Sequence, residues 1–316
     1  MNNFKKIGLT ALAGSLVATS VYAGEMSVAG SASWRISNHA GTDGGKTMAM
    51  GNQLTFTGGG EMDNGMNVAL SFTLDQGDAA GSGPFDSHSI SVGSDAMGTV
   101  TFAGDGASSA QNTLDTTAAG DIWANTFTSA AGVAYAKPAN ASAGTKTLRW
   151  TLPSLMDGLA ADVSYTGSGT DAEATVGYAL TYTGVEGLSV SYGAGEVAGN
   201  TAGTTGADVT TMKASFAFGP ITAAMSINDY DITGASNEEQ SSYNISYSIS
   251  DELSVSYGSE THETTGQTTD EEFDQISVSY TTGGLTASVR QTNADNVNGA
   301  TQSEQSQWNV GLSFAF

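Results

Sequence analysis

The sequence predicts an all-β fold, a 16-stranded antiparallel β-barrel that spans a membrane. Apolar and polar residues alternate with a period of two, and the connections between the alternating segments are short and long in turn. After the N-terminus, no segment is apolar enough to be a membrane helix. Because only helices and closed barrels satisfy their backbone hydrogen bonds in lipid, a membrane location requires a barrel.

The last segment of the chain shows the alternation best. One face carries only bulky apolar residues, Trp308, Val310, Leu312, Phe314 and Phe316. The opposite face stays small or polar, and the same pattern recurs in segments 66–75, 212–218 and 242–250. A soluble sandwich also alternates, but its water-exposed face would carry Lys and Glu freely. We therefore expect the apolar face to contact lipid and the small polar face to line a lumen.

The connections give the number of strands. Short connections are predicted at 63–65, 94–97, 153–158, 184–186, 219–220, 251–252 and 283–284. Long ones are predicted at 38–49, 77–86, 105–144, 167–172, 195–207, 233–239, 262–272 and 294–304. These seven short turns and eight long loops imply 16 strands with both termini on the short-turn side. A barrel of that size leaves an aqueous channel.

The first 23 residues have the pattern of a secretory signal peptide. Lys5 and Lys6 precede an apolar stretch, and small residues occupy the −3 and −1 positions in Val21-Tyr22-Ala23. We therefore expect two parts, a signal peptide at 1–23 and a barrel at 24–316, which has 316 − 23 = 293 residues.

The barrel is strongly acidic. Without the two signal lysines, 7 basic and 32 acidic residues give a net charge of 7 − 32 = −25. Such a chain repels nucleic acid and attracts cations, although acidity can also serve solubility alone. The acidic runs Glu238-Glu239 and Asp270-Glu271-Glu272 fall in predicted outer loops. They could bind divalent cations that bridge to lipopolysaccharide, but a hydrated surface is the favoured interpretation.

Catalytic chemistry is not indicated. His39, His88 and His262 are the only histidines, they fall in or beside predicted loops, and none forms a metal-binding or nucleophile–base pattern. Cysteine is absent, so no cysteine-ligated metal is expected. The sequence predicts a protein that is not an enzyme and that needs no cofactor.

Three features together resemble the trimeric Gram-negative general porins over the whole chain after the signal. The chain ends in an alternating strand with a terminal Phe316. Residues 146–155, Lys-Thr-Leu-Arg-Trp-Thr-Leu-Pro-Ser-Leu, followed by Gly158-Leu159, are similar to a turn after the third loop of many porins. The third long connection, 105–144, is by far the longest.

The resemblance implies an outer-membrane protein of a Gram-negative bacterium, a homotrimer with one pore per subunit, and passive diffusion of small hydrophilic solutes. It also implies that Phe316 is read by the barrel-assembly machinery and that the third loop folds into the lumen to narrow it. Acidic residues on that loop would face basic residues on the wall. By position, the acids are Asp115 and Asp121, with Asp105 where the loop leaves its strand.

By alternation, only four basic residues point into the lumen, Arg35, Arg149, Lys213 and Arg290. The other inward acids are Glu61, Asp75, Asp162 and Glu173. Porin constrictions often carry a larger arginine cluster, so this balance predicts a preference for cations. Lys213 could equally anchor the loop or serve permeation, and Asp115 and Asp121 could be helix caps within the loop rather than selectivity groups. A substrate-selective channel and a structural or adhesion barrel with a plugged lumen are the competing functions.

Overall fold

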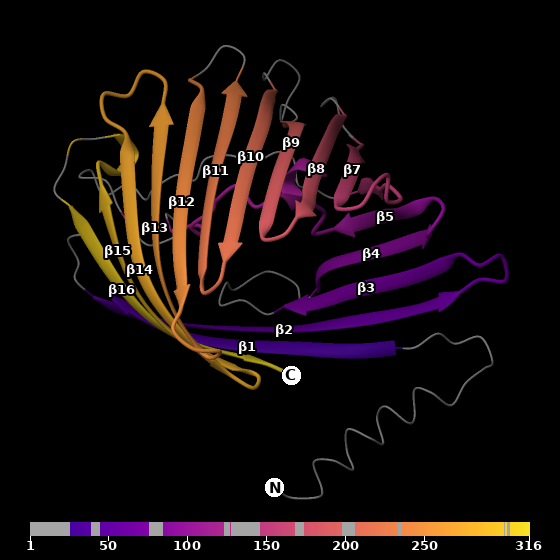
Figure 1. Cartoon of the computed structure of the whole chain (residues 1–316), viewed down its shortest axis with the longest axis horizontal. Coiled ribbons are helices and arrows are strands. Elements are labelled where there is room, and N and C mark those ends of the chain that lie inside the picture. Colours follow the sequence, from indigo (N-terminus) through magenta and orange to yellow (C-terminus); the bar gives the residue numbers. More distant parts are fainter. Residues whose placement is uncertain are drawn as a thin grey trace, which may run out of the picture.

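The computed structural model describes residues 26–38, 45–75, 85–122, 127, 146–167, 174–197, 206–232, 236–299, 301 and 304–316. Its 16 strands form one closed antiparallel barrel, so the predicted fold class is confirmed. Figure 1 shows the strands following one another around the wall in sequence order. In these ranges no helix is long and apolar enough to cross a bilayer. The predicted signal peptide lies outside the described residues.

The strands that precede the long third loop are β1 (Met26–Asn38), β2 (Lys46–Glu61), β3 (Asn67–Asp75), β4 (Phe85–Ser94) and β5 (Gly98–Asp105). Those that follow it are β6 (Thr147–Thr151), β7 (Leu159–Thr166), β8 (Thr175–Val185), β9 (Leu188–Val197), β10 (Ala207–Phe218), β11 (Ile221–Ile232), β12 (Glu238–Ser248), β13 (Leu253–Thr264), β14 (Glu271–Thr282), β15 (Leu285–Asp295) and β16 (Gln305–Ala315). Two short 3-10 helices, η1 (Gln111–Thr113) and η2 (Val297–Gly299), lie in connections.

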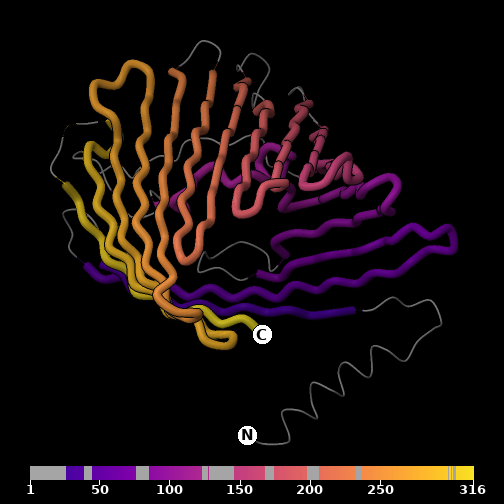
Figure 2. Tube along the Cα trace, in the orientation of Figure 1, coloured from indigo at the N-terminus to yellow at the C-terminus, as the bar shows by residue number. Residues whose placement is uncertain are grey.

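The barrel closes where its first strand pairs with its last. Gly30 and Phe316 exchange two backbone hydrogen bonds, with N···O distances of 2.8 and 2.9 Å. A Cβ at Gly30 would lie 2.4 Å from the Phe316 ring, so a larger residue there requires that ring to shift. The trace in Figure 2 runs strand by strand from indigo β1 to yellow β16, and these two strands pair at the seam.

The two faces of the wall differ as the alternation predicts. The outward positions carry large exposed apolar side chains along every strand, including Leu70, Ile90, Leu180, Ile245 and Val289. Few large apolar side chains are buried among the described residues, so no core lies between stacked sheets. The inward positions carry hydroxyl groups that pair across strands. Examples are Ser37–Thr47 at 2.9 Å, Thr181–Ser191 at 2.9 Å and Ser256–Ser277 at 2.7 Å.

The predicted turns at 219–220 and 283–284 match the structure, but several long-loop boundaries were wrong. β2 already begins at Lys46, inside the connection predicted at 38–49. β13 continues to Thr264 and β14 begins at Glu271, which shortens the connection predicted at 262–272. Glu238 and Glu239, predicted in a loop, are the first residues of β12. The strands therefore extend further toward the long-loop end than the alternation indicated.

Candidate constriction site in the barrel lumen

The third connection leaves β5 and its described residues follow the inner wall. The Ala110 amide donates to Ser164 Oγ on β7 at 2.8 Å, and Gln111 Nε2 donates to Thr211 Oγ1 on β10 at 2.7 Å. Farther on, Ser226 Oγ on β11 donates to the Thr116 carbonyl at 2.8 Å. All of these wall residues occupy inward positions. The predicted inward fold of the loop is thus confirmed for residues 106–122.

Glycines on the wall let the loop approach closely. A Cβ at Gly177 on β8 would lie 3.4 Å from Ser109 Cβ. At Gly193 on β9 it would lie 2.8 Å from Leu114 Cδ1, and at Gly258 on β13 it would lie 2.7 Å from Ala119 Cβ. Larger residues at the last two positions would push the loop toward the centre of the lumen. The glycines on the wall therefore help to determine how much of the cross-section of the lumen the loop occupies.

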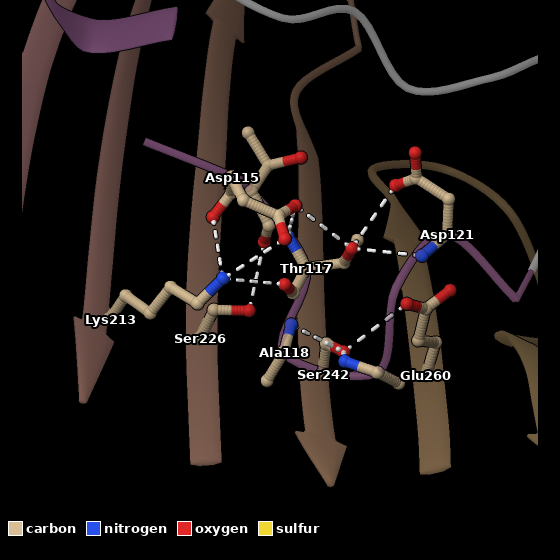
Figure 3. Close-up of polar contacts among 10 residues, drawn as sticks. Asp115, Thr117, Ala118, Asp121, Lys213, Ser226, Ser242 and Glu260 are labelled. Carbon is tan, nitrogen blue, oxygen red and sulfur yellow. Dashed lines mark hydrogen bonds and ion pairs between the residues drawn. The ribbon is translucent and has the colours of Figure 1, made fainter. Parts of the chain in front are cut away.

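Lys213 on β10 holds the middle of the loop. Its ammonium group donates to the Asp115 carbonyl at 3.4 Å and to the Thr117 carbonyl at 2.9 Å. It also pairs with the Asp115 carboxylate at 3.1 Å. Figure 3 shows these contacts converging on the Lys213 nitrogen from the loop. Lys213 therefore anchors the loop, one of the two roles that the sequence left open.

The two loop acids also shape the turn that they belong to. The Asp115 carboxylate accepts the Thr117 amide at 3.0 Å, and the Thr117 hydroxyl lies 3.2 Å from Asp115 Oδ1 and 3.1 Å from Asp121 Oδ1. Asp121 has a positive φ of 51°, a conformation in which aspartate is among the more tolerated residues. The Asp115 side chain is nevertheless 59% exposed, so it combines local bonding with a face toward the solvent-accessible lumen.

A second contact between the wall and the loop involves β12 and β13. Ser242 Oγ on β12 accepts the amides of Ala118 and Ala119 at 3.0 and 2.9 Å. The Ser242 hydroxyl donates to Glu260 Oε1 on β13 at 3.2 Å. Both side chains are buried, Ser242 at 0% and Glu260 at 1% exposure. Figure 3 shows Ser242 between Ala118 and Glu260.

A small apolar cluster packs beyond this contact. Ile122 and Phe127 of the loop pack with Phe273 on β14, Ala294 on β15 and Val297 in η2. The Phe127 and Phe273 ring centroids are 5.8 Å apart. Because these side chains point into the barrel, the cluster attaches the loop to the inner wall as a hydrophobic contact rather than belonging to a conventional core.

Arg149 on β6 faces Asp162 on β7 across the adjacent strand pair. Its Nε lies 3.7 Å from Asp162 Oδ1, and the Thr151 hydroxyl donates to the same oxygen at 2.5 Å. Arg149 also lines a recess that contains Asp105, whose carboxylate accepts the Gly106 amide at 3.0 Å. Asp105 therefore lies at the root of the loop, in the same recess as a basic wall residue.

Arg35 on β1 and Arg290 on β15 lie on a separate part of the wall. Both are exposed and line one recess, whose other inward groups are small or uncharged and include Ser33, Ser288 and Asn309. Within the described part of the chain, neither arginine lies within 4.0 Å of a carboxylate. Two strands that lie directly opposite in a ring of 16 are eight positions apart. Counted around the wall through β11, β12, β13, β14, β15 and β16, β1 is seven positions from β10, the strand that carries Lys213. Arg35 therefore stands almost opposite Asp115.

Comparison with known proteins decides the family. The sequence profile described as Gram-negative porin matches residues 8–316. This chain belongs to the Gram-negative porin family. It is a channel protein of the outer membrane, and the resemblance found in its sequence is confirmed. A search of the curated proteins found no match.

Solved structures share the fold of this porin at low sequence identity. The anion-selective porin from Comamonas acidovorans is 14% identical, with a TM-score of 0.70 over 93% of this chain and 100% of that chain. Salmonella typhi OmpF, solved in complex with daunomycin, is 13% identical, with a TM-score of 0.74 over 93% of this chain and 98% of that chain. The trimer form of OmpT from Vibrio cholerae is 13% identical, with a TM-score of 0.65 over 93% and 100% of the two chains.

The remaining predicted residues of this porin fall in different places. Glu61 and Asp75 occupy inward positions at the ends of β2 and β3, outside the loop contacts. Glu173 lies outside the described residues. Phe316 lies at the barrel seam with an exposed side chain. No group of three or more His, Cys, Asp or Glu in the described ranges could hold a metal ion.

Sequence reasoning missed several wall residues that help to hold this porin's loop, among them Ser226, Ser242 and Glu260. Alternation places all three on the inward face, and that signal was available. A serine among many inward serines cannot be recognised from sequence as a loop contact. Glu260 does differ from the small inward residues that precede it on β13, Ser254, Ser256 and Gly258.

Proposed function

We propose that this outer-membrane porin is a passive diffusion channel for small hydrophilic solutes and ions, that it prefers cations, and that it works as a homotrimer. Solutes would move down their own concentration gradients. The constriction would lie between the loop acids Asp105, Asp115 and Asp121 and the opposite wall.

The observation that carries the cation preference is that the acids at the loop and on the inward wall outnumber the four lumenal cations. Lys213 and Arg149 already face carboxylates, Asp115 and Asp162, at 3.1 and 3.7 Å. That pairing leaves Arg35 and Arg290 as the wall cations without a carboxylate within 4.0 Å among the described residues. Fixed negative charge in a narrow lumen concentrates cations, so the excess of acids favours their passage.

The arrangement also separates charge across the lumen. Asp115 lies on the loop side, and Arg35 lies nearly opposite it, with Arg290 two strands away from Arg35 in the same recess. A hydrated ion that passes between them meets a transverse field, which orients polar solutes and favours small ones over bulky ones. The balance of charge, rather than the fold, would decide the sign of selectivity, because the Comamonas acidovorans relative is anion-selective.

Assembly and surroundings complete the proposal. The Vibrio cholerae OmpT structure is of a trimer form, which supports a homotrimer here. The outward apolar side chains would contact outer-membrane lipid, with lipopolysaccharide at the outer rim. Phe316, 76% exposed at the end of the closing strand, would be accessible to the barrel-assembly machinery.

Planar-bilayer recording of the purified protein tests this function. We expect stable channels that conduct KCl ohmically and a reversal potential in a KCl gradient whose sign gives potassium more permeability than chloride. A reversal potential of the opposite sign would refute the cation preference. Conductance near zero would support a plugged barrel, and current that saturates with one solute would support a substrate-selective channel.

A further inference from the structure

We infer that Glu260 is a positioning residue for the channel. Through the Ser242 hydroxyl, it holds the 118–119 segment of the inward loop on the wall and thereby sets the open width of the pore. This inference rests on the proposed channel function and deepens it.

The hydrogen-bond geometry shows which group donates and which accepts in each bond around Ser242. Ser242 Oγ accepts two amides, those of Ala118 and Ala119, at 3.0 and 2.9 Å. Both lone pairs of the oxygen are then occupied, so the one hydroxyl proton must be donated elsewhere. It goes to Glu260 Oε1 at 3.2 Å, which makes Glu260 the acceptor that orients the serine.

Burial makes this contact strong. Ser242 and Glu260 are 0% and 1% exposed, so solvent does not compete for their hydrogen bonds. A hydrogen bond to a carboxylate is about twice as strong as one between neutral groups, and it polarises the next bond in a chain. Glu260 therefore strengthens the hold of Ser242 on the loop through the serine hydroxyl.

Lys213, Ser242 and Glu260 together form what we call the clamp, and they bind both ends of a single peptide unit. The Thr117 carbonyl accepts from the Lys213 ammonium at 2.9 Å, and the amide of the same peptide, that of Ala118, donates to Ser242. A cation thus binds the negative end of the peptide dipole, and an anion-backed hydroxyl binds the positive end. Figure 3 shows Lys213 and the Ser242–Glu260 pair on either side of this peptide.

The clamp lies at the part of the loop that narrows the lumen. Asp115 and Asp121, the loop acids of the proposed constriction, flank residues 117–119. Any release of this turn from β12 moves both carboxylates relative to the opposite wall. Glu260 is therefore placed to affect permeation without facing the permeating ion.

The test compares Glu260→Gln, Ser242→Ala and the double variant with the wild type in bilayer recordings. We expect each single variant to change the single-channel conductance and add open-channel noise, and the double variant to match Ser242→Ala. Ser242→Ala keeps the charge, so its effect cannot come from lumenal electrostatics. Glu61→Gln, which removes a carboxylate from an inward position away from the loop, is the matched control for charge and should add no open-channel noise, whatever it does to the conductance.

A second readout follows the loop directly. Because the chain has no cysteine, Ala119→Cys gives one thiol, at a side chain packed against Gly258. Its modification rate constant with a water-soluble thiosulfonate should rise about tenfold in the Ser242→Ala background, because the loop loses two buried hydrogen bonds, which together are worth about that factor in an opening equilibrium. Ser242→Ala also keeps the local charge, so the thiol pKa is not a competing explanation.

The outcomes separate this inference from the proposed function. If the wild type conducts but Glu260→Gln and Ser242→Ala match it in conductance, noise and thiol reactivity, the clamp role is wrong and the channel stands. If Glu260→Gln further alters noise when Ser242 is already alanine, Glu260 does not act through the serine. If the wild type does not conduct, the proposed function fails, and the thiol rates still decide whether the clamp holds the loop.

Discussion

Replacing Lys213 with methionine should loosen the inward loop. The substitution keeps the length of the side chain but removes contacts at 2.9, 3.1 and 3.4 Å. With exposed fractions of 25% and 59%, the pairing of Lys213 with Asp115 is screened and contributes about 0.5 kcal/mol. Each hydrogen bond to a loop carbonyl contributes about 1 kcal/mol, so the loop loses about 2–3 kcal/mol of local stability.

That loss multiplies the population of the released loop by about 30–150, since 1.4 kcal/mol corresponds to a factor of ten. Bilayer recordings should therefore show substates or added noise in Lys213→Met. Arg290→Gln is the matched control, because it removes the same charge from the wall but has no described contact with the loop. Quiet, full-size Lys213→Met channels would refute the anchoring role, as would the same noise in Arg290→Gln.

Three further predictions concern the lumenal arginines, the barrel seam and the root of the inward loop. Arg35→Gln combined with Arg290→Gln should raise the potassium-to-chloride permeability ratio by about twofold or more, because positive charge leaves the lumen; reversal potentials measure it. Gly30→Val should lower the free energy of unfolding in micelles by about 1–3 kcal/mol, because the new side chain meets the terminal ring, and urea titration measures it. Ser109→Cys with Gly177→Cys should form a disulfide, because the two Cβ positions lie 3.4 Å apart, and thiol titration after mild oxidation measures it.

Each of these outcomes has its own control. A permeability ratio that falls in the arginine variant would contradict the assigned lumenal electrostatics. Gly58→Val should cost little, since nothing lies within 4 Å of a Cβ at that position, and equal losses at the two glycines would remove the steric explanation. Free thiols that persist after oxidation of the double cysteine variant would mean that residue 109 does not rest on β8.

The number of strands and the two faces of the wall could be predicted because a period of two assigns every residue of a strand to one side. Strand ends could not. At the long-loop end of β13, residues 261–264 are Thr, His, Glu and Thr, and both faces of the wall are polar there. Beyond the hydrocarbon region, water meets both faces, so the alternation disappears although the pairing of β13 with its neighbours continues.

The sequence could predict which wall residues point into the lumen, but not which of them contact the inward loop. Alternation placed Lys213 inward, yet its choice between anchoring and permeation depended on the path of an irregular loop. That path brings Ala118 to Ser242, 124 residues later in the chain, and no periodic pattern encodes such a contact. Arg35 and Arg290 could not be grouped from sequence alone either, because their proximity follows from closure of the barrel between β1 and β16.

Because the first strand pairs with the last, the barrel can close only after all 16 strands have been synthesised. β1 keeps one open edge until β16, the last strand of the barrel in chain order, has paired with it. In hydrocarbon, each unpaired peptide group on such an edge costs several kcal/mol, so an unfinished sheet has no stable place in the bilayer. A chain interrupted anywhere between these strands must stay in water or be degraded, and only complete copies accumulate in the membrane.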